Sequence, residues 1–92
     1  MFRPADQRNV QAAMDAALPQ PFQAEIELLE GRSRMRVFVA DPDNHAMPVA
    51  QVTWDYYTFK TMNGKPQPRE GELAYVILQF VAACQAYAAS KG

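Results

Sequence analysis

Two carboxylates and the only histidine of this chain lie close together in the segment DPDNHAMP, residues 41–48. Asp41, Asp43 and His45 alternate there, and such a donor set can bind a metal ion. Zinc takes three or four ligands of this kind, and calcium takes six or more oxygen atoms. The segment lacks the glycine and the closing glutamate of a calcium-binding loop. We therefore favour a polar loop whose Asp and Asn side chains cap their own backbone, and we predict no metal or other cofactor.

The nucleophilic side chains have no recognisable catalytic surroundings. Cys84 is the only cysteine, which excludes a disulfide within the chain, and it falls on the apolar stripe of the C-terminal segment. A cysteine in that position is expected to be a small buried hydrophobic residue. Ser33 and Ser90 lie outside any nucleophile motif, and the four glycines are too scattered to form a phosphate-binding loop. We predict that the protein has no catalytic residues and is not an enzyme.

Arginines alternate with other residues along positions 32–36, and an aromatic residue continues their side. Arginines interleaved with aromatic rings on an open sheet are typical of surfaces that hold single-stranded nucleic acid. The candidate nucleic-acid-binding residues are Arg32, Arg34, Arg36, Phe38 and Tyr57, the last of which is expected on the neighbouring strand.

Acidic residues are expected beside this arginine stripe, because Glu25, Glu27 and Asp55 fall on the adjoining strands. They would neutralise much of its charge, and a net charge of −1 gives the protein no general positive field. The stripe is then a solvated sheet face with cross-strand ion pairs. Alternatively, Arg34, Arg36 and Phe38 contact a protein partner.

The segment from Leu73 to Ser90 contains no charge, proline or glycine. One side of the expected helix is apolar, and the opposite side carries no charge either. A helix that is apolar nearly all round is usually covered on more than one side. We therefore predict that the opposite side is a protein interface, at Tyr75, Leu78, Gln79 and Ala82.

Three arrangements would cover that side. The first helix or residues 61–70 could pack on it, a different protein could dock there, or two copies could pair through their helices. Alanines let helices approach closely, so an antiparallel pair across a two-fold axis is a natural homodimer. A membrane-spanning helix is disfavoured, because the segment is near the lower length limit and contains few strongly apolar residues.

Periodicity predicts the elements that position these residues. Residues 4–18 form a helix that Pro19 and Pro21 end. Residues 22–30 and 34–40 alternate as half-buried strands, with Gly31 and Arg32 as the two loop residues of a hairpin. In that register Leu28 faces Met35, Ile26 faces Val37 and Glu27 faces Arg36, and a slip of one residue would break every match.

Residues 49–60 are predicted to form a third strand, followed by a turn at Asn63-Gly64 and a short edge strand or loop at 65–69. The last helix is expected to begin near Arg69 or Glu70. The order is helix, three strands, a possible short fourth strand, helix. It predicts a single α+β domain over residues 1–92, a two-layer sandwich with both helices on one face of an antiparallel sheet.

This order resembles the topology of double-stranded-RNA-binding domains. In that family the last helix begins with a lysine cluster, and the first inter-strand loop is long. Here the corresponding helix start, EGELAYV from Glu70, is acidic and apolar, and the loop is the tight turn at Gly31-Arg32. The resemblance therefore implies a shared architecture and no RNA-binding residues.

The sequence thus predicts a small, non-enzymatic protein-interaction domain of the accessory, adaptor or inhibitor type, as phages and other mobile elements often carry. It would act by sterically blocking a partner. A nucleic-acid-binding module that uses the arginine stripe is the alternative. One cysteine and the lack of an apolar run near residue 1 predict a cytoplasmic location.

Overall fold

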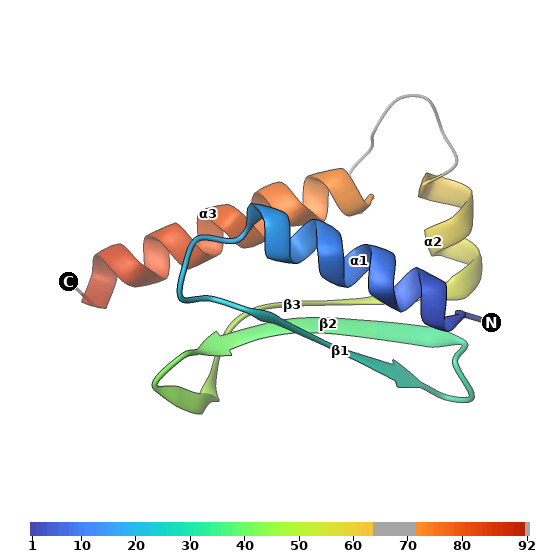
Figure 1. Ribbon diagram of the computed structural model, residues 1–92, viewed down its shortest axis with the longest axis horizontal. Helices are drawn as coiled ribbons and strands as arrows, with labels where there is room; N and C mark the ends of the chain where they lie inside the picture. Colours follow the sequence, from blue (N-terminus) through green and yellow to red (C-terminus); the bar gives the residue numbers. More distant parts are fainter. Residues whose placement is uncertain (64–71, 92) are drawn as a thin grey trace.

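The computed structural model describes residues 1–63 and 72–91 and places two long helices on one face of a three-stranded antiparallel sheet (Figure 1). The strands are arranged in the order β1-β2-β3. This confirms the predicted α+β class. In chain order the elements are α1 (Pro4–Ala17), β1 (Ala24–Leu29), β2 (Arg34–Asp41), β3 (Asn44–Asp55), α2 (Tyr56–Asn63) and α3 (Leu73–Lys91).

The hairpin between β1 and β2 has the predicted register. Leu28 pairs with Met35, Ile26 with Val37 and Glu27 with Arg36. Glu30, Gly31 and Arg32 have φ angles of 51°, 63° and 69°, so the left-handed region extends one residue beyond the predicted two-residue loop of Gly31 and Arg32. Only glycine adopts that conformation without strain, so Gly31 is the residue that the turn needs most.

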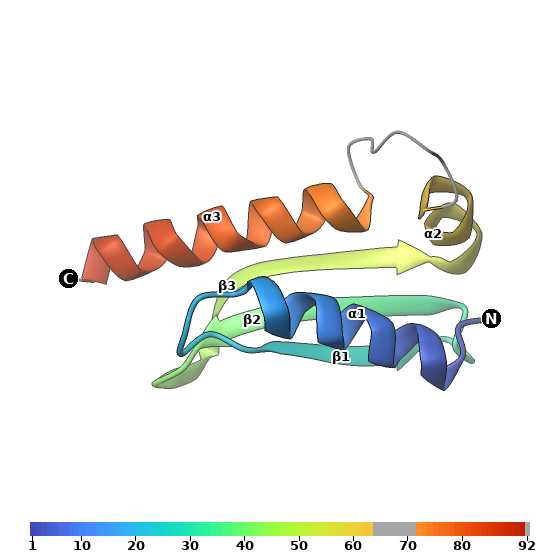
Figure 2. The same cartoon turned by 45° about the horizontal axis from the view of Figure 1, so that its top comes forward.

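The core lies between the sheet and the two long helices. Met35, Val37 and Val39 of the central strand are each 0% exposed, because strands flank them and helices cover them. α1 packs over β1 and α3 packs over β3 (Figure 2). From the two long helices, the buried residues are Val10, Met14, Val76, Phe80 and Cys84.

The predicted loop over residues 41–48 is wrong in extent. The structure has a two-residue turn at Pro42 and Asp43, and β3 already begins at Asn44. Asp41 pairs with Asn44 across this turn, and the register shifts between Val39 and Asp41. The irregularity accommodates Pro48, which cannot donate a ladder hydrogen bond, so the turn-rich segment is still able to extend the sheet.

The predicted third strand is also wrong at its end. β3 stops at Asp55, and residues 56–63 form helix α2. Oδ2 of Asp55 accepts hydrogen bonds from the backbone N–H groups of Tyr57, at 3.1 Å, and Thr58, at 3.4 Å, and so caps the helix. Phe59 is only 7% exposed, which shows that the helical turn buries an aromatic side chain that an extended strand would place elsewhere.

Two sequence predictions concern residues that the structure does not describe. The possible edge strand at 65–69 and the expected helix start near Arg69 or Glu70 both lie outside the described residues. Of the predicted turn at Asn63-Gly64, only Asn63 is described, and it is the last residue of α2.

Candidate functional site

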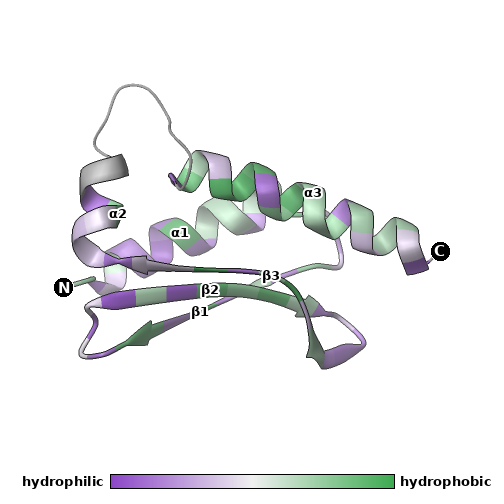
Figure 3. Cartoon of the chain, turned by 180° about the vertical axis from the view of Figure 1, so that it is seen from behind, coloured by the Kyte–Doolittle hydropathy of each residue, from purple (hydrophilic) through white to green (hydrophobic). Residues whose placement is uncertain are grey.

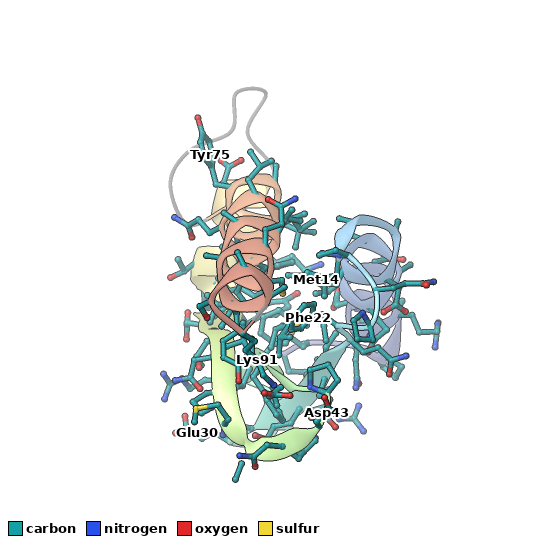
Figure 4. The ribbon with its side chains drawn as sticks, turned by 90° about the vertical axis from the view of Figure 1, so that its left-hand side faces the viewer. Met14, Phe22, Glu30, Asp43, Tyr75 and Lys91 are labelled. Atoms are coloured by element: carbon teal, nitrogen blue, oxygen red, sulfur yellow. The ribbon has the colours of Figure 1, made fainter. Side chains whose placement is uncertain are left out.

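The outer side of α3 exposes two large apolar side chains, Tyr75 and Leu78. Leu78 is 65% exposed and Tyr75 is 42% exposed, and no charge lies between them or farther along the helix as far as Ser90. Figure 3 shows hydrophobic colours along much of α3. Tyr75 projects away from the sheet (Figure 4). The predicted interface residues are thus exposed together on one side. This outer side consists of Tyr75, Leu78, Gln79, Ala82, Gln85, Ala86 and Ala89.

The inner side of α3 fixes the helix on the sheet. Val76, Phe80 and Cys84 recur at every fourth residue and are at most 3% exposed. α3 is long and apolar enough to cross a membrane, a test that core helices also pass, and 17% of its apolar window is buried. Leu73, Ile77, Val81 and Tyr87 are partly buried against the core, whereas the outer-side residues are exposed, so α1 and the described sheet do not cover them. The alternative cover by residues 61–70 falls largely outside the described residues.

A polar cluster holds the C-terminal end of α3. Asp41, the last residue of β2, is 3% exposed and accepts hydrogen bonds from the hydroxyl of Tyr87 and from Nζ of Lys91, the latter at 2.6 Å. It also accepts one from the backbone N–H of Asp43 at 2.7 Å. Tyr87 and Lys91 are four residues apart, so both reach the same side of the helix. The cluster therefore fixes the direction in which the outer side faces.

The hydrogen bonds from Lys91 and Tyr87 hold the pKa of Asp41 well below its usual range. The hydrogen bond to Asp41 also raises the pKa of Tyr87 and that of Lys91. A carboxyl group whose pKa is lower in the folded protein stabilises the fold at pH values above its pKa in the unfolded chain, about 3.9. This stabilisation is lost as the pH falls toward the pKa of the folded protein. A lysine or tyrosine whose pKa is higher in the folded protein stabilises the fold at pH values below its pKa in the unfolded chain, about 10. This stabilisation is lost as the pH rises above that pKa.

We expect Asp41→Asn to destabilise the protein most between about pH 5 and pH 9, where all three groups keep their charge states. The stability difference from the unmodified chain should shrink as the pH falls below about 4, because the Asp41 carboxyl then binds a proton in the unfolded chain while the folded protein still keeps it ionised. Urea unfolding at pH 7 and pH 3 measures both differences. An equal difference at the two pH values would show that the carboxylate charge does not matter.

The predicted arginine stripe lies on the open face of the sheet, and ion pairs neutralise it. Arg36 donates to Oε1 of Glu27 at 3.1 Å, and Arg34 lies 3.6 Å from a Glu30 carboxylate oxygen. The Arg36 guanidinium also stacks on the ring of Phe38 at 4.8 Å. These exposed pairs contribute little stability, about 0 to 1 kcal/mol each, but they occupy the charges that phosphates would need.

Tyr57 is not on this face, contrary to the sequence prediction. It belongs to α2 and is 81% exposed there, because the strand ends at Asp55. Arg32 lies in the hairpin turn, where its backbone oxygen accepts a hydrogen bond from Phe2 at 2.7 Å. The structure therefore places Arg34, Arg36 and Phe38 on one face and separates Tyr57 from them.

The candidate metal loop is engaged in other interactions. Asp41 is buried in the cluster with Lys91 and Tyr87, while Nε2 of His45 lies 2.7 Å from Glu25 on the opposite face. Oδ1 of Asp41 caps Asp43, and Oδ1 of Asn44 accepts from Ala46 at 3.2 Å, so the predicted side-chain capping is confirmed. Residues 1–63 and 72–91 contain no group of three or more His, Cys, Asp or Glu residues that could hold a metal ion.

Cys84 has the predicted core position. It is 0% exposed, and burial raises the pKa of its thiol, so the thiolate that a nucleophile requires is scarce at neutral pH.

Sequence reasoning missed the Asp41 cluster, although it contained a signal. Met35, Val37 and Val39 alternate toward the core, and continuing the alternation by one step places Asp41 on the buried face. A carboxylate at such a position must find donors, which the last turn of α3 supplies.

No known family model matches the chain, and no curated protein or solved structure matches it.

Proposed function

We propose that the protein is a small, non-enzymatic protein-interaction domain whose contact surface is the outer side of α3. The observation that supports this most directly is Leu78, which is 65% exposed on a helix side without any charge. Large apolar side chains on an uncharged exposed patch are typical of protein contact sites. α3 is held from behind by its core residues and by Asp41, so the surface is presented on a rigid support.

The proposed mode of action is steric. An accessory, adaptor or inhibitor protein without catalytic groups works by occupying a surface of its partner, and a rigid helix side of this kind suits that role. Proteins of this type are often encoded by phages and other mobile elements, and the cytoplasm is the proposed location. The open sheet face with Arg34, Arg36 and Phe38 is the proposed second contact. The pairing of its arginines makes it the weaker candidate.

Photo-crosslinking tests the interface. With p-benzoylphenylalanine in place of Tyr75, we expect discrete crosslinked products in purified protein or in a lysate of the organism that encodes it. The same substitution at Tyr57 is a matched control, because Tyr57 is an even more exposed tyrosine on a different helix. Adding Leu78→Asp should suppress the Tyr75 products by at least about tenfold, because it places a charge within the contact.

Products that form equally from position 57, or that survive Leu78→Asp, would contradict the proposal. So would the absence of any product from position 75 in both samples.

A further inference from the structure

The outer side of α3 is symmetric in the spacing of its residues about Ala82. Four residues before Ala82 stands Leu78, and four residues after it stands Ala86; seven residues before stands Tyr75, and seven after stands Ala89. All five residues are exposed. If two antiparallel helices were related by a two-fold axis at Ala82, each large side chain would therefore face an alanine of the other copy. Such alternation of large and small residues lets two helices interdigitate closely.

The polar groups fit the same arrangement. Gln79 and Gln85 lie three residues on either side of Ala82, so they would face each other, and an amide both donates and accepts hydrogen bonds. The antiparallel direction also brings opposite ends of the two helix dipoles together. A parallel pair would place like ends side by side.

We infer that the partner of the proposed interface is a second copy of this chain, held in an antiparallel α3–α3 pair with Ala82 on the two-fold axis. The inference rests on the proposed function and names its partner.

The uncharged span of 18 residues is about 27 Å long, and a helix is about 10 Å across. One face of it therefore covers a few hundred Å², less than the roughly 800 Å² per partner of a standard interface. The pairing is accordingly weak, with a dissociation constant in the micromolar range or above.

Light scattering tests the pairing itself. The mass should rise from that of one chain, 10.3 kDa, toward twice that value as the concentration increases from about 5 μM to about 500 μM, since these concentrations span a micromolar dissociation constant.

Single cysteines test the register. The Cα atoms of a helix lie about 2.3 Å from its axis, and packed helices have axes about 8–10 Å apart. The Cα atoms of the two copies of residue 82 would then be about 3.4–5.4 Å apart, which overlaps the roughly 4.4–6.8 Å that a disulfide spans. The two copies of residue 89 would be about 21 Å apart, because each lies seven residues from the two-fold axis at 1.5 Å per residue.

We therefore expect Ala82→Cys to form a disulfide-linked dimer under mild oxidation, at least about tenfold faster than Ala89→Cys, given this difference in separation. Ala88→Cys is a second control, exposed on the same helix but off the outer side. The unmodified chain controls for Cys84, which is buried and should not react.

Each other outcome overturns the inference in a different way. Equal trapping at positions 82 and 89 would indicate a parallel or unspecific contact. A constant mass of one chain without trapping at position 82 would exclude the pair. If the Tyr75 photo-crosslinks to another protein persisted in that case, the proposed function would stand with a foreign partner. Sedimentation with phosphatidylcholine vesicles without trapping would assign the outer side to lipid.

Discussion

Phe2→Ala is expected to remove about 3–5 kcal/mol of stability, a large part of the 5–14 kcal/mol typical of a domain of this size. Phe2 is 0% exposed, and its ring meets Tyr56 at 5.2 Å and Phe59 at 5.4 Å, both edge to face. Its backbone N–H donates to the oxygen of Arg32 at 2.7 Å. One residue thus joins the start of α1, the hairpin turn and α2, and its truncation leaves a cavity where all three meet.

Urea unfolding monitored by circular dichroism measures this effect. We expect the midpoint of Phe2→Ala to fall by more than about 1 M, whereas Tyr57→Ala should stay within about 0.5 kcal/mol of the unmodified chain. Tyr57 is a matched control because it is an aromatic residue of α2 that is 81% exposed. A loss of less than about 1 kcal/mol of stability for Phe2→Ala would show that Phe2 does not hold the start of α1, the hairpin turn and α2 together.

The β1–β2 hairpin was predictable because its information is local. Alternating residues on both strands fix which side faces the core, and Gly31 fixes the loop length, so a single register satisfies Ile26 with Val37 and Glu27 with Arg36. The same holds for α1, where the apolar spacing and Pro19 determine the length of the helix.

Helix α2 was not predictable in this way. Its first four residues, Tyr-Tyr-Thr-Phe, all favour strands, so the local preference continues β3. The helix forms because Asp55 caps it and because a helical turn places Phe59 against Trp54 and Phe2, with ring centroids 5.1 Å and 5.4 Å apart. Phe2 is more than fifty residues away in the chain, so tertiary packing overrides local propensity here.

The candidate site likewise has one part that local sequence predicts and one part that depends on contacts between distant segments. The outer side of α3 was predictable, since a helix with apolar residues all round must turn one side away from its own core. The Asp41 cluster that holds the helix was not predictable, because Asp41 is separated from Tyr87 and Lys91 by 46 and 50 residues of sequence. A sequence read segment by segment treats Asp41 as a turn residue and cannot show that it anchors a helix.

Phe80→Asp and Leu78→Asp are expected to have opposite consequences, although they introduce the same charge two residues apart on one helix. Phe80 is 3% exposed and lies against the sheet, so a carboxylate there would be buried without a partner. We expect Phe80→Asp to lose more than about 3 kcal/mol and to leave much of the protein unfolded, since it combines a lost aromatic ring with a buried charge. Circular dichroism and urea unfolding measure this loss.

Leu78→Asp should instead leave the stability within about 0.5 kcal/mol, because Leu78 is 65% exposed and solvent reaches the new carboxylate. In an α3–α3 pair the change enters the contact twice, and two losses of about 1.4 kcal/mol weaken association about a hundredfold. Light scattering at high concentration should therefore find one chain mass for a folded protein. If Leu78→Asp unfolded the protein, Leu78 would belong to the core, and the outer side of α3 would no longer qualify as an interface.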